Sequence, residues 1–145
     1  MREVIIATRE HISRIAELEA ATFNEPWSES ALELFLGDSA FCVALVDGGE
    51  LLSYCTVVTV LDEAQIINVA TDACHLRQGL AREVLESVFA ECKKRDIISI
   101  SLEVRESNFA AITLYQKLSF TVAGKRRDFY KNPRENALVM IKNLD

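Results

Sequence analysis

The run from residue 68 to residue 104 constrains the fold of this chain more than any other part. β-Favouring residues end near Ala70, and a helical pattern begins at Leu80 and continues to about Lys94. Residues 97 to 104 then alternate between apolar and polar side chains, as in a strand with one buried face. A strand, a helix and a second strand in this order are typical of an α/β sheet. The apolar faces consist of Leu80, Val84, Leu85, Val88, Phe89 and Cys92 in the helix and Ile98, Ile100, Leu102 and Val104 in the strand.

The flanking segments supply the other elements. Thr8 is a candidate cap for a helix that carries apolar residues at helical spacing, and a shorter helix is expected between Pro26 and Gly37. Asn108 caps a further predicted helix, and the Asp-Gly-Gly-Glu run at residues 47–50 predicts a hairpin. The remaining strands are expected at residues 3–8, 41–46, 51–60, 64–70, 120–125 and 137–142.

These elements follow the order β-α-α-β-β-β-α-β-α-β-β, which predicts an α/β fold with a mixed central β-sheet flanked by helices. The 145 residues are enough to bury one core, and no linker, repeat or low-complexity stretch divides them. We therefore expect residues 1–145 to form a single domain.

The charge of the chain narrows the classes of partner. The net charge is −6 and no basic stripe stands out, so no nucleic acid is expected as a direct ligand. An acidic surface instead favours a cationic partner such as an amine or a basic peptide. No apolar run approaches the roughly 20 residues that a membrane-spanning helix needs, and the first residues lack the layout of a secretory signal. We expect a cytoplasmic protein without a membrane partner.

The metal-ligating residue types are scattered along the chain. The four cysteines lie far apart, and the two histidines add no ligand spacing, so no metal site is expected. In a reducing compartment these thiols are interpreted as small apolar core residues. The cysteines are Cys42, Cys55, Cys74 and Cys92, and the histidines are His11 and His75.

The passage from the strand near Ala70 into the helix at Leu80 has the composition of an anion site. A helix N-terminus presents unpaired N–H groups, and Gly79 removes a side chain where a phosphate must come close. Arg77 and Arg82 add positive charge. On the residues alone, a plain helix start with solvated arginines explains this segment equally well. The glycines of a nucleotide P-loop or a dinucleotide fingerprint are absent.

Two blocks of the sequence resemble the GNAT family of N-acetyltransferases. Residues 77–81 are similar to the loop that binds the acetyl-CoA pyrophosphate in that family, with Leu76 at a position where Gln or Arg is usual. Residues 102–115 resemble the later family motif, in which a strand ends and a helix begins with Asn and carries Leu-Tyr. Ser119 replaces the usual Gly before Phe120, and there a left-handed backbone costs a serine roughly 1 kcal/mol.

Further matches narrow the resemblance to the RimI-type ribosomal-protein alanine N-acetyltransferases of bacteria. They lie at residues 23–29, 61–64, 102–108 and 126–130, so the similarity spans nearly the whole chain in order. The resemblance implies acetyl-CoA as co-substrate, no metal, and the N-terminal alanine of a small-subunit ribosomal protein as the acceptor.

The resemblance also assigns the acid–base groups. Transfer to an α-amine, with a pKa near 8, needs a base to remove a proton, and the leaving thiolate needs a donor. The matching residues imply that Glu103 is the general base and Tyr115 the general acid. Without the resemblance, Glu103 reads as a solvated strand carboxylate and Tyr115 as a packing residue on an apolar helix face.

Binding residues follow from the same comparison. The implied acetyl-CoA contacts are Val69, Ala70 and Thr71 through their backbone, the loop residues Arg77, Gln78, Gly79, Leu80, Ala81 and Arg82, and Asn108, which also suits a helix cap. The candidates for the peptide groove are Trp27, Asp62, Glu63, Arg127 and Tyr130. Trp27 also fits a packing role in its loop, and the Asp-Glu pair also fits a solvated turn.

Two other functions stay open on the sequence. One is acetylation of a small amine or of another protein N-terminus, which keeps the fold and the co-substrate. The other is a non-catalytic acyl-CoA-binding module, which the departures at Leu76 and Ser119 favour and the retained Glu103 and Tyr115 oppose.

Overall fold

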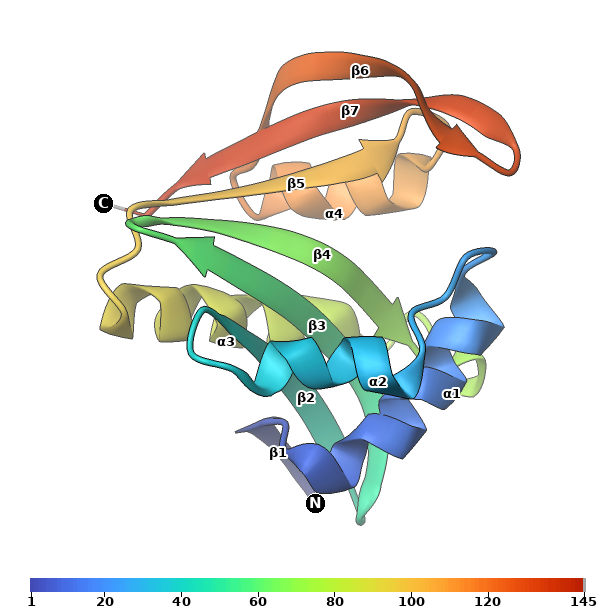
Figure 1. Ribbon diagram of the computed structural model, residues 1–145, viewed down its shortest axis with the longest axis vertical. Helices are drawn as coiled ribbons and strands as arrows, with labels where there is room; N and C mark the ends of the chain where they lie inside the picture. The colour runs from blue at the N-terminus through green and yellow to red at the C-terminus, as the bar shows by residue number, and fades with distance from the viewer. Residues whose placement is uncertain (145) are drawn as a thin grey trace.

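A computed structural model describes residues 1–144 and contains one mixed sheet with helices on both faces (Figure 1). The seven strands follow the order β1-β2-β3-β4-β5-β7-β6, and only β4 and β5 are parallel neighbours. The strands are β1 (Arg2–Ile6), β2 (Ala40–Asp47), β3 (Glu50–Val60), β4 (Glu63–Thr71), β5 (Ser99–Arg105), β6 (Thr121–Lys131) and β7 (Arg134–Asn143). The helices are α1 (Ile12–Thr22), α2 (Glu29–Leu32), α3 (Leu80–Lys94) and α4 (Phe109–Lys117), with 3-10 turns η1 (Arg9–His11), η2 (Glu33–Leu36) and η3 (Ala73–His75).

The predicted order of helices and strands is confirmed. The hairpin between β2 and β3 turns at Gly48 and Gly49, whose φ angles of 59° and 85° are those that favour glycine. Helix α3 begins directly after Gly79, as its apolar stripe predicts.

The strand expected from residue 97 is shorter than predicted. It begins at Ser99, and Ile98 lies outside it with 56% of its surface exposed. The backbone N–H of Ile98 donates to the carbonyl of Asp62 (2.8 Å), which ties the turn before β4 to the start of β5. Ile98 therefore does not share the buried face of Ile100. The alternation of apolar and polar residues begins in the sequence before the first residue of the strand, so the pattern alone placed Ile98 inside it.

Two hydrophobic cores form, one on each face of the sheet. Helices α3 and α4 cover the larger core, which includes Leu85, Leu102 and Phe120. Helices α1 and α2 cover the smaller core, which includes Ile15 and Tyr54, and Figure 1 shows them on the opposite side of the strands from α3. The two cores therefore lie on opposite faces of the sheet.

Three of the four cysteines are buried in these cores, and Cys74 is exposed. Burial raises the pKa of Cys42 to about 12 and that of Cys92 to about 11, and it also holds the pKa of Cys55 well above its ordinary value. The buried thiols therefore stay protonated and act as packing groups.

Strands β4 and β5 separate soon after they begin. Their parallel pairing extends only from Glu63 opposite Ser99 to Gln65 opposite Ser101. One extra residue, Ile67, interrupts the ladder between β4 and β3, and such a bulge bends and twists its strand. Figure 1 shows the two strands diverging from this point. The second half of β4 and the end of β5 thus border an opening in the sheet.

Ser119 has the left-handed backbone that its position in the sequence predicts, with a φ of 74°. It follows α4, where Phe120 N–H donates to the Tyr115 carbonyl (2.9 Å) and closes the helix end. Replacing Ser119 by Gly should raise the free energy of unfolding by roughly 0.5–1 kcal/mol, because glycine adopts this conformation without steric cost. Urea denaturation measures the change. The same substitution at Ser87, inside α3, should lower stability by a similar amount, and a destabilised Ser119→Gly variant would contradict the argument.

Candidate active site

The loop between β4 and α3 is anchored at Asp72. Its carboxylate accepts hydrogen bonds from the Cys74 N–H (2.8 Å) and from Arg14 Nη2 (2.7 Å). The Cys74 N–H, with Arg14 and His75, lowers the pKa of Asp72 to about 2. The Asp72 N–H donates to the Leu52 carbonyl (2.8 Å), so both the side chain and the backbone of Asp72 are held by hydrogen bonds. The chain therefore leaves β4 in a defined direction toward the start of α3.

The mouth of α3 can accept an anion. Gly79 is the N-cap residue with a φ of 77°, and a Cβ added there would meet no protein atom within 4 Å. The first N–H groups of a helix have no partner within it and carry partial positive charge. Arg77 is exposed in the loop, and Arg82 forms an exposed ion pair with Glu86 (3.7 Å). Amides, an open approach and two cations together fit a pyrophosphate.

Glu103 lies on β5, on the face opposite Leu102, with 14% of its side-chain surface exposed. Gln65 Nε2 donates to its Oε1 (3.2 Å), and Arg126 forms an ion pair with its Oε2. The carboxylate is thus held in place from β4 and β6, and it is not a freely solvated strand residue.

Tyr115 lies on α4 with 8% of its surface exposed, and its ring meets the Phe120 ring edge-on at 5.7 Å. Its hydroxyl makes no hydrogen bond within residues 1–144, and none of the fully buried side-chain oxygens there lacks a partner. The hydroxyl therefore reaches accessible space. Burial raises the pKa of Tyr115 well above its ordinary value, so the group stays protonated and can donate. Tyr115 therefore packs against Phe120 and also keeps a proton on an accessible hydroxyl.

Tyr130 lies within electrostatic range of both groups. Burial raises the pKa of Tyr130, and the negative charge of Glu103 raises it further. Tyr130 in turn contributes to the raised pKa of Tyr115. The Arg105 guanidinium covers the Tyr130 ring at 4.3 Å. The structure therefore gathers these side chains near the opening between β4 and β5.

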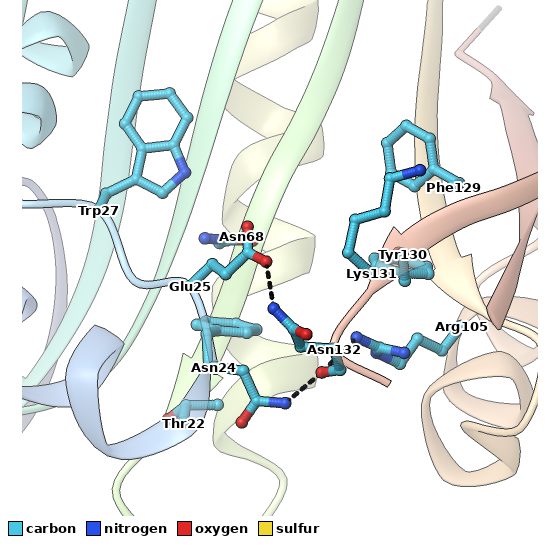
Figure 2. Close-up of a pocket in the computed structure, with 11 residues that line it drawn as sticks. Thr22, Asn24, Glu25, Trp27, Asn68, Arg105, Phe129, Tyr130, Lys131 and Asn132 are labelled. Carbon is cyan, nitrogen blue, oxygen red and sulfur yellow. Dashed lines mark hydrogen bonds between the residues drawn. The ribbon is translucent and has the colours of Figure 1, made fainter. Parts of the chain in front are cut away.

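A cavity of about 400 Å³ adjoins this group, between the α1–α2 loop and the β6–β7 hairpin (Figure 2). Asn132 of the hairpin donates to Glu25 (3.0 Å), and its carbonyl accepts from Asn24, so polar contacts join the two walls. Arg105 holds the hairpin through the carbonyls of Pro133 (2.9 Å) and Asn132 (3.2 Å). The lining residues are Thr22, Phe23, Asn24, Glu25, Trp27, Asn68, Arg105, Phe129, Tyr130, Lys131 and Asn132.

The structure brings only some of the predicted groove residues together. Trp27 and Tyr130 line the cavity, and the Trp27 ring also packs at a tilt against the Phe35 ring, with centroids 5.2 Å apart, as the packing alternative predicts. Asp62 lies in the turn before β4 and Glu63 is the first residue of β4, where this strand pairs with β5, and neither lines the cavity. Arg127 is exposed on β6 and does not line it either.

Three of the predicted cofactor residues border the opening through their backbone. Val69, Ala70 and Thr71 pair with β3 along one edge, and β5 does not pair with their other edge, so alternate backbone groups face the gap. Asn108 caps α4, where its Oδ1 accepts from the Ala111 N–H (3.2 Å), and this leaves its amide nitrogen for another contact. Gln78 precedes Gly79 in the loop, and Leu80 and Ala81 are the first two residues of α3. Leu80 is buried.

Several residues that line the cavity were not predicted as site residues from the sequence. Asn68 stands within a predicted strand, whereas Arg105 is the last residue of β5 and lies one residue beyond the strand predicted there. Asn132 precedes Pro133 in a turn, which marks a loop but not what the loop faces. Nothing in their local sequence indicates that they meet.

Among residues 1–144, no cluster of three or more His, Cys, Asp or Glu side chains could hold a metal ion. Over the same residues, every helix is too short or too polar to cross a membrane.

The fold and the open helix mouth suit an enzyme that binds a pyrophosphate-bearing co-substrate, and comparison with known sequences gives the family. The model of the acetyltransferase (GNAT) family matches residues 12–120, and the chain belongs to this family. The ribosomal protein bS18-alanine N-acetyltransferase of Escherichia coli is 39% identical over 117 residues, which cover 79% of each chain.

Solved structures agree with this placement. The crystal structure of the ribosomal-protein alanine N-acetyltransferase of Escherichia coli superposes with a TM-score of 0.93 at 33% identity, and covers 100% of this chain and 95% of that one. Arabidopsis thaliana NAA60 in complex with acetyl-CoA has a TM-score of 0.89 over 99% of both chains. Its identity of 15% shows a shared fold.

Proposed function

We propose that this protein transfers the acetyl group of acetyl-CoA to the N-terminal α-amine of a small-subunit ribosomal protein in the cytoplasm, with alanine as the first residue of the acceptor. The observation that carries the proposal is the early separation of β4 from β5, which leaves Glu103 beside an opening between the helix mouth and the cavity. The relative from Escherichia coli, whose name states this activity, supports the choice of acceptor.

The co-substrate fits the residues at the start of α3. The N–H groups after Gly79 and the charges of Arg77 and Arg82 suit the pyrophosphate, and no Cβ obstructs the approach. The free edge of β4 at Val69–Thr71 suits the amide groups of the pantetheine arm. Asn108 has one amide nitrogen left for the same ligand.

The chemistry assigns one proton transfer to each of two side chains. When bound, acetyl-CoA supplies a thioester whose carbonyl carbon the amine attacks. Glu103 takes the proton that the amine loses as its nitrogen bonds to that carbon. The carbon–sulfur bond breaks, and the Tyr115 hydroxyl gives its proton to the departing sulfur. Gln65 keeps the base in place throughout through its hydrogen bond to Oε1.

The cavity suits the end of a peptide chain. It lies between two loops, and Glu25, Asn68 and Asn24 bring oxygen acceptors to its walls. A protonated amine is a hydrogen-bond donor, so it can bond to these oxygens, and the orientation of the oxygens rather than the charge of the lining, which includes Arg105 and Lys131, suits it.

A peptide assay tests the proposal. A synthetic peptide that begins with alanine should gain one acetyl group on its α-amine in the presence of enzyme and acetyl-CoA, as intact mass and fragmentation show. The same peptide with a blocked N-terminus is the control and should gain none. Modification of lysine side chains alone would contradict the proposed acceptor. Protection of acetyl-CoA without thiol release would instead indicate a binding module.

Replacing Gly79 by Ala should weaken acetyl-CoA binding about tenfold. The Cβ of an alanine projects into the open approach at the helix mouth and keeps the phosphate from the first N–H groups, whereas its left-handed backbone costs about 1–2 kcal/mol of protein stability. Calorimetric titration with acetyl-CoA measures the affinity. Gly48→Ala is the matched control, because Gly48 has a φ of 59° and equally open surroundings but lies in the β2–β3 hairpin. Equal effects of both variants on affinity would contradict a phosphate site at Gly79.

A further inference from the structure

A buried carboxylate that the proposed chemistry does not use lies beside the cavity. Glu19, on α1, has no exposed surface and accepts three hydrogen bonds. The donors are Tyr54 Oη (2.6 Å) and Asn68 Nδ2 (2.7 Å) to its Oε1, and the backbone N–H of Trp27 (3.0 Å) to its Oε2. Within residues 1–144 it has no ion-pair partner.

The three partners determine the chemistry of this position. A backbone N–H and an amide nitrogen can only donate, so Glu19 must accept from both, and a carboxylate is the acidic side chain that accepts at both oxygens. Burial together with the Glu19 carboxylate holds the pKa of Tyr54 well above its ordinary value, so Tyr54 also donates. A buried charge is costly unless hydrogen bonds satisfy it, and here three donors do so.

Two of the three donors belong to the cavity wall. Asn68 and Trp27 line the cavity, whereas Glu19 does not and Tyr54 is fully buried in the core. Asn68 follows the bulge at Ile67, where β4 turns away from β5. Figure 2 shows Asn68 and Trp27 on the side of the cavity that faces the β6–β7 hairpin. Glu19 thus connects the strand and the loop that form this wall.

The bond to Glu19 also settles which way the Asn68 amide points. Its nitrogen is engaged by Glu19, and its Oδ1 has no hydrogen bond within residues 1–144. Since none of the fully buried side-chain oxygens in that part of the chain is unpaired, Oδ1 is accessible. Asn68 is accessible at the cavity, so Oδ1 offers an acceptor there.

We propose that Glu19 is a positioning residue of the acceptor site: it orients Asn68 so that Oδ1 receives an N–H of the incoming chain end, and it fixes the backbone of Trp27 in the same wall. The proposal rests on the proposed function in taking an amine-bearing chain end as the ligand. It adds a recognition contact at Asn68 and a buried carboxylate that governs it.

Glu19→Gln is the decisive variant, since it keeps the shape but replaces one acceptor oxygen by a donor. The amide must turn its NH2 toward Asn68 and Tyr54 or toward Trp27, so one contact becomes donor against donor. We expect the KM for the alanine peptide to rise about tenfold, which corresponds to the loss of one hydrogen bond of 1.4 kcal/mol. The KM for acetyl-CoA and kcat should change less than twofold.

Two further variants separate positioning from mere stability. Tyr54→Phe removes a donor to the same carboxylate without altering Asn68 or Trp27, so it should lower the Tm and leave the peptide KM within twofold. In an Asn68→Ala background, Glu19→Gln should raise the peptide KM much less than it does in the wild type. Equal rises in peptide KM for Tyr54→Phe and Glu19→Gln, or an unchanged KM in Glu19→Gln, overturn the proposal.

A readout without acceptor keeps this inference separate from the proposed function. In the ¹⁵N-labelled protein, Glu19→Gln should shift the side-chain NH2 signals of Asn68 and the Trp27 amide signal and speed their exchange with solvent. If the wild type acetylates no alanine peptide, the proposed function fails, and these signals decide the positioning role. Unchanged Asn68 signals in Glu19→Gln overturn it.

Discussion

Replacing Glu103 by Gln lowers kcat for acetylation of an alanine peptide about 100- to 1,000-fold, the range typical of a lost general base. The variant keeps a hydrogen-bonding side chain of the same size between Gln65 and Arg126, so the local packing is preserved. The loss therefore reports the missing proton acceptor. A steady-state assay of thiol release with saturating acetyl-CoA measures it.

The pH dependence of the loss in kcat tests whether the missing group is a base. An α-amine has a pKa of about 7.7–8.0, so at higher pH its lone pair is already free, and the base is left only with the proton that the nitrogen loses as the amide forms. The gap between Glu103→Gln and the wild type should accordingly narrow as the pH rises above about 8. Glu91→Gln, an isosteric change on α3 far from the cavity, serves as the control and should match the wild type. A Glu103→Gln variant with full turnover at pH 7 would contradict the assignment.

Replacing Tyr115 by Phe should lower kcat about 100-fold and leave the fold almost as stable as before. The ring keeps its contact with Phe120, and the lost hydroxyl makes no hydrogen bond within residues 1–144. The leaving thiolate resembles that of cysteine, with a pKa of about 8.5, so without a donor it departs as an anion.

Thermal unfolding and turnover, measured on the same Tyr115→Phe preparation, separate the two roles of the residue. Because burial raises the pKa of Tyr115, its proton stays in place through the neutral and mildly alkaline range, and no decline of wild-type activity there should arise from this group. A stable variant with unchanged kcat would show that Tyr115 only packs.

Local patterns were enough to predict the elements of the fold. The apolar stripe of Leu80–Lys94 and the Gly48-Gly49 turn each depend on neighbouring residues, so their prediction needed no distant contact. The separation of β4 from β5 could not be predicted in this way. It depends on the bulge at Ile67, which breaks the pairing with β3, and on β7 pairing with the other edge of β5.

The site was predictable only in part, for a related reason. The resemblance indicated Glu103 and Tyr115, and the structure places both near Tyr130. The cavity itself joins residues from α1, β4, β5 and the β6–β7 hairpin, which no sequence spacing connects. Asp62 matched the family pattern as well as Trp27 did, yet the direction of β4 carries it to the other end of the sheet.

The opening between β4 and β5 has a consequence for how the reactants meet. On the proposed function, the mouth of α3 would hold the donor and the cavity would hold the amine, so the two would be bound at the same time and would react with each other directly. The acyl group then has no need to rest on an enzyme nucleophile between two half-reactions. The buried, protonated thiols of Cys42, Cys55 and Cys92 are unsuited to act as such a nucleophile, whereas Cys74 is exposed.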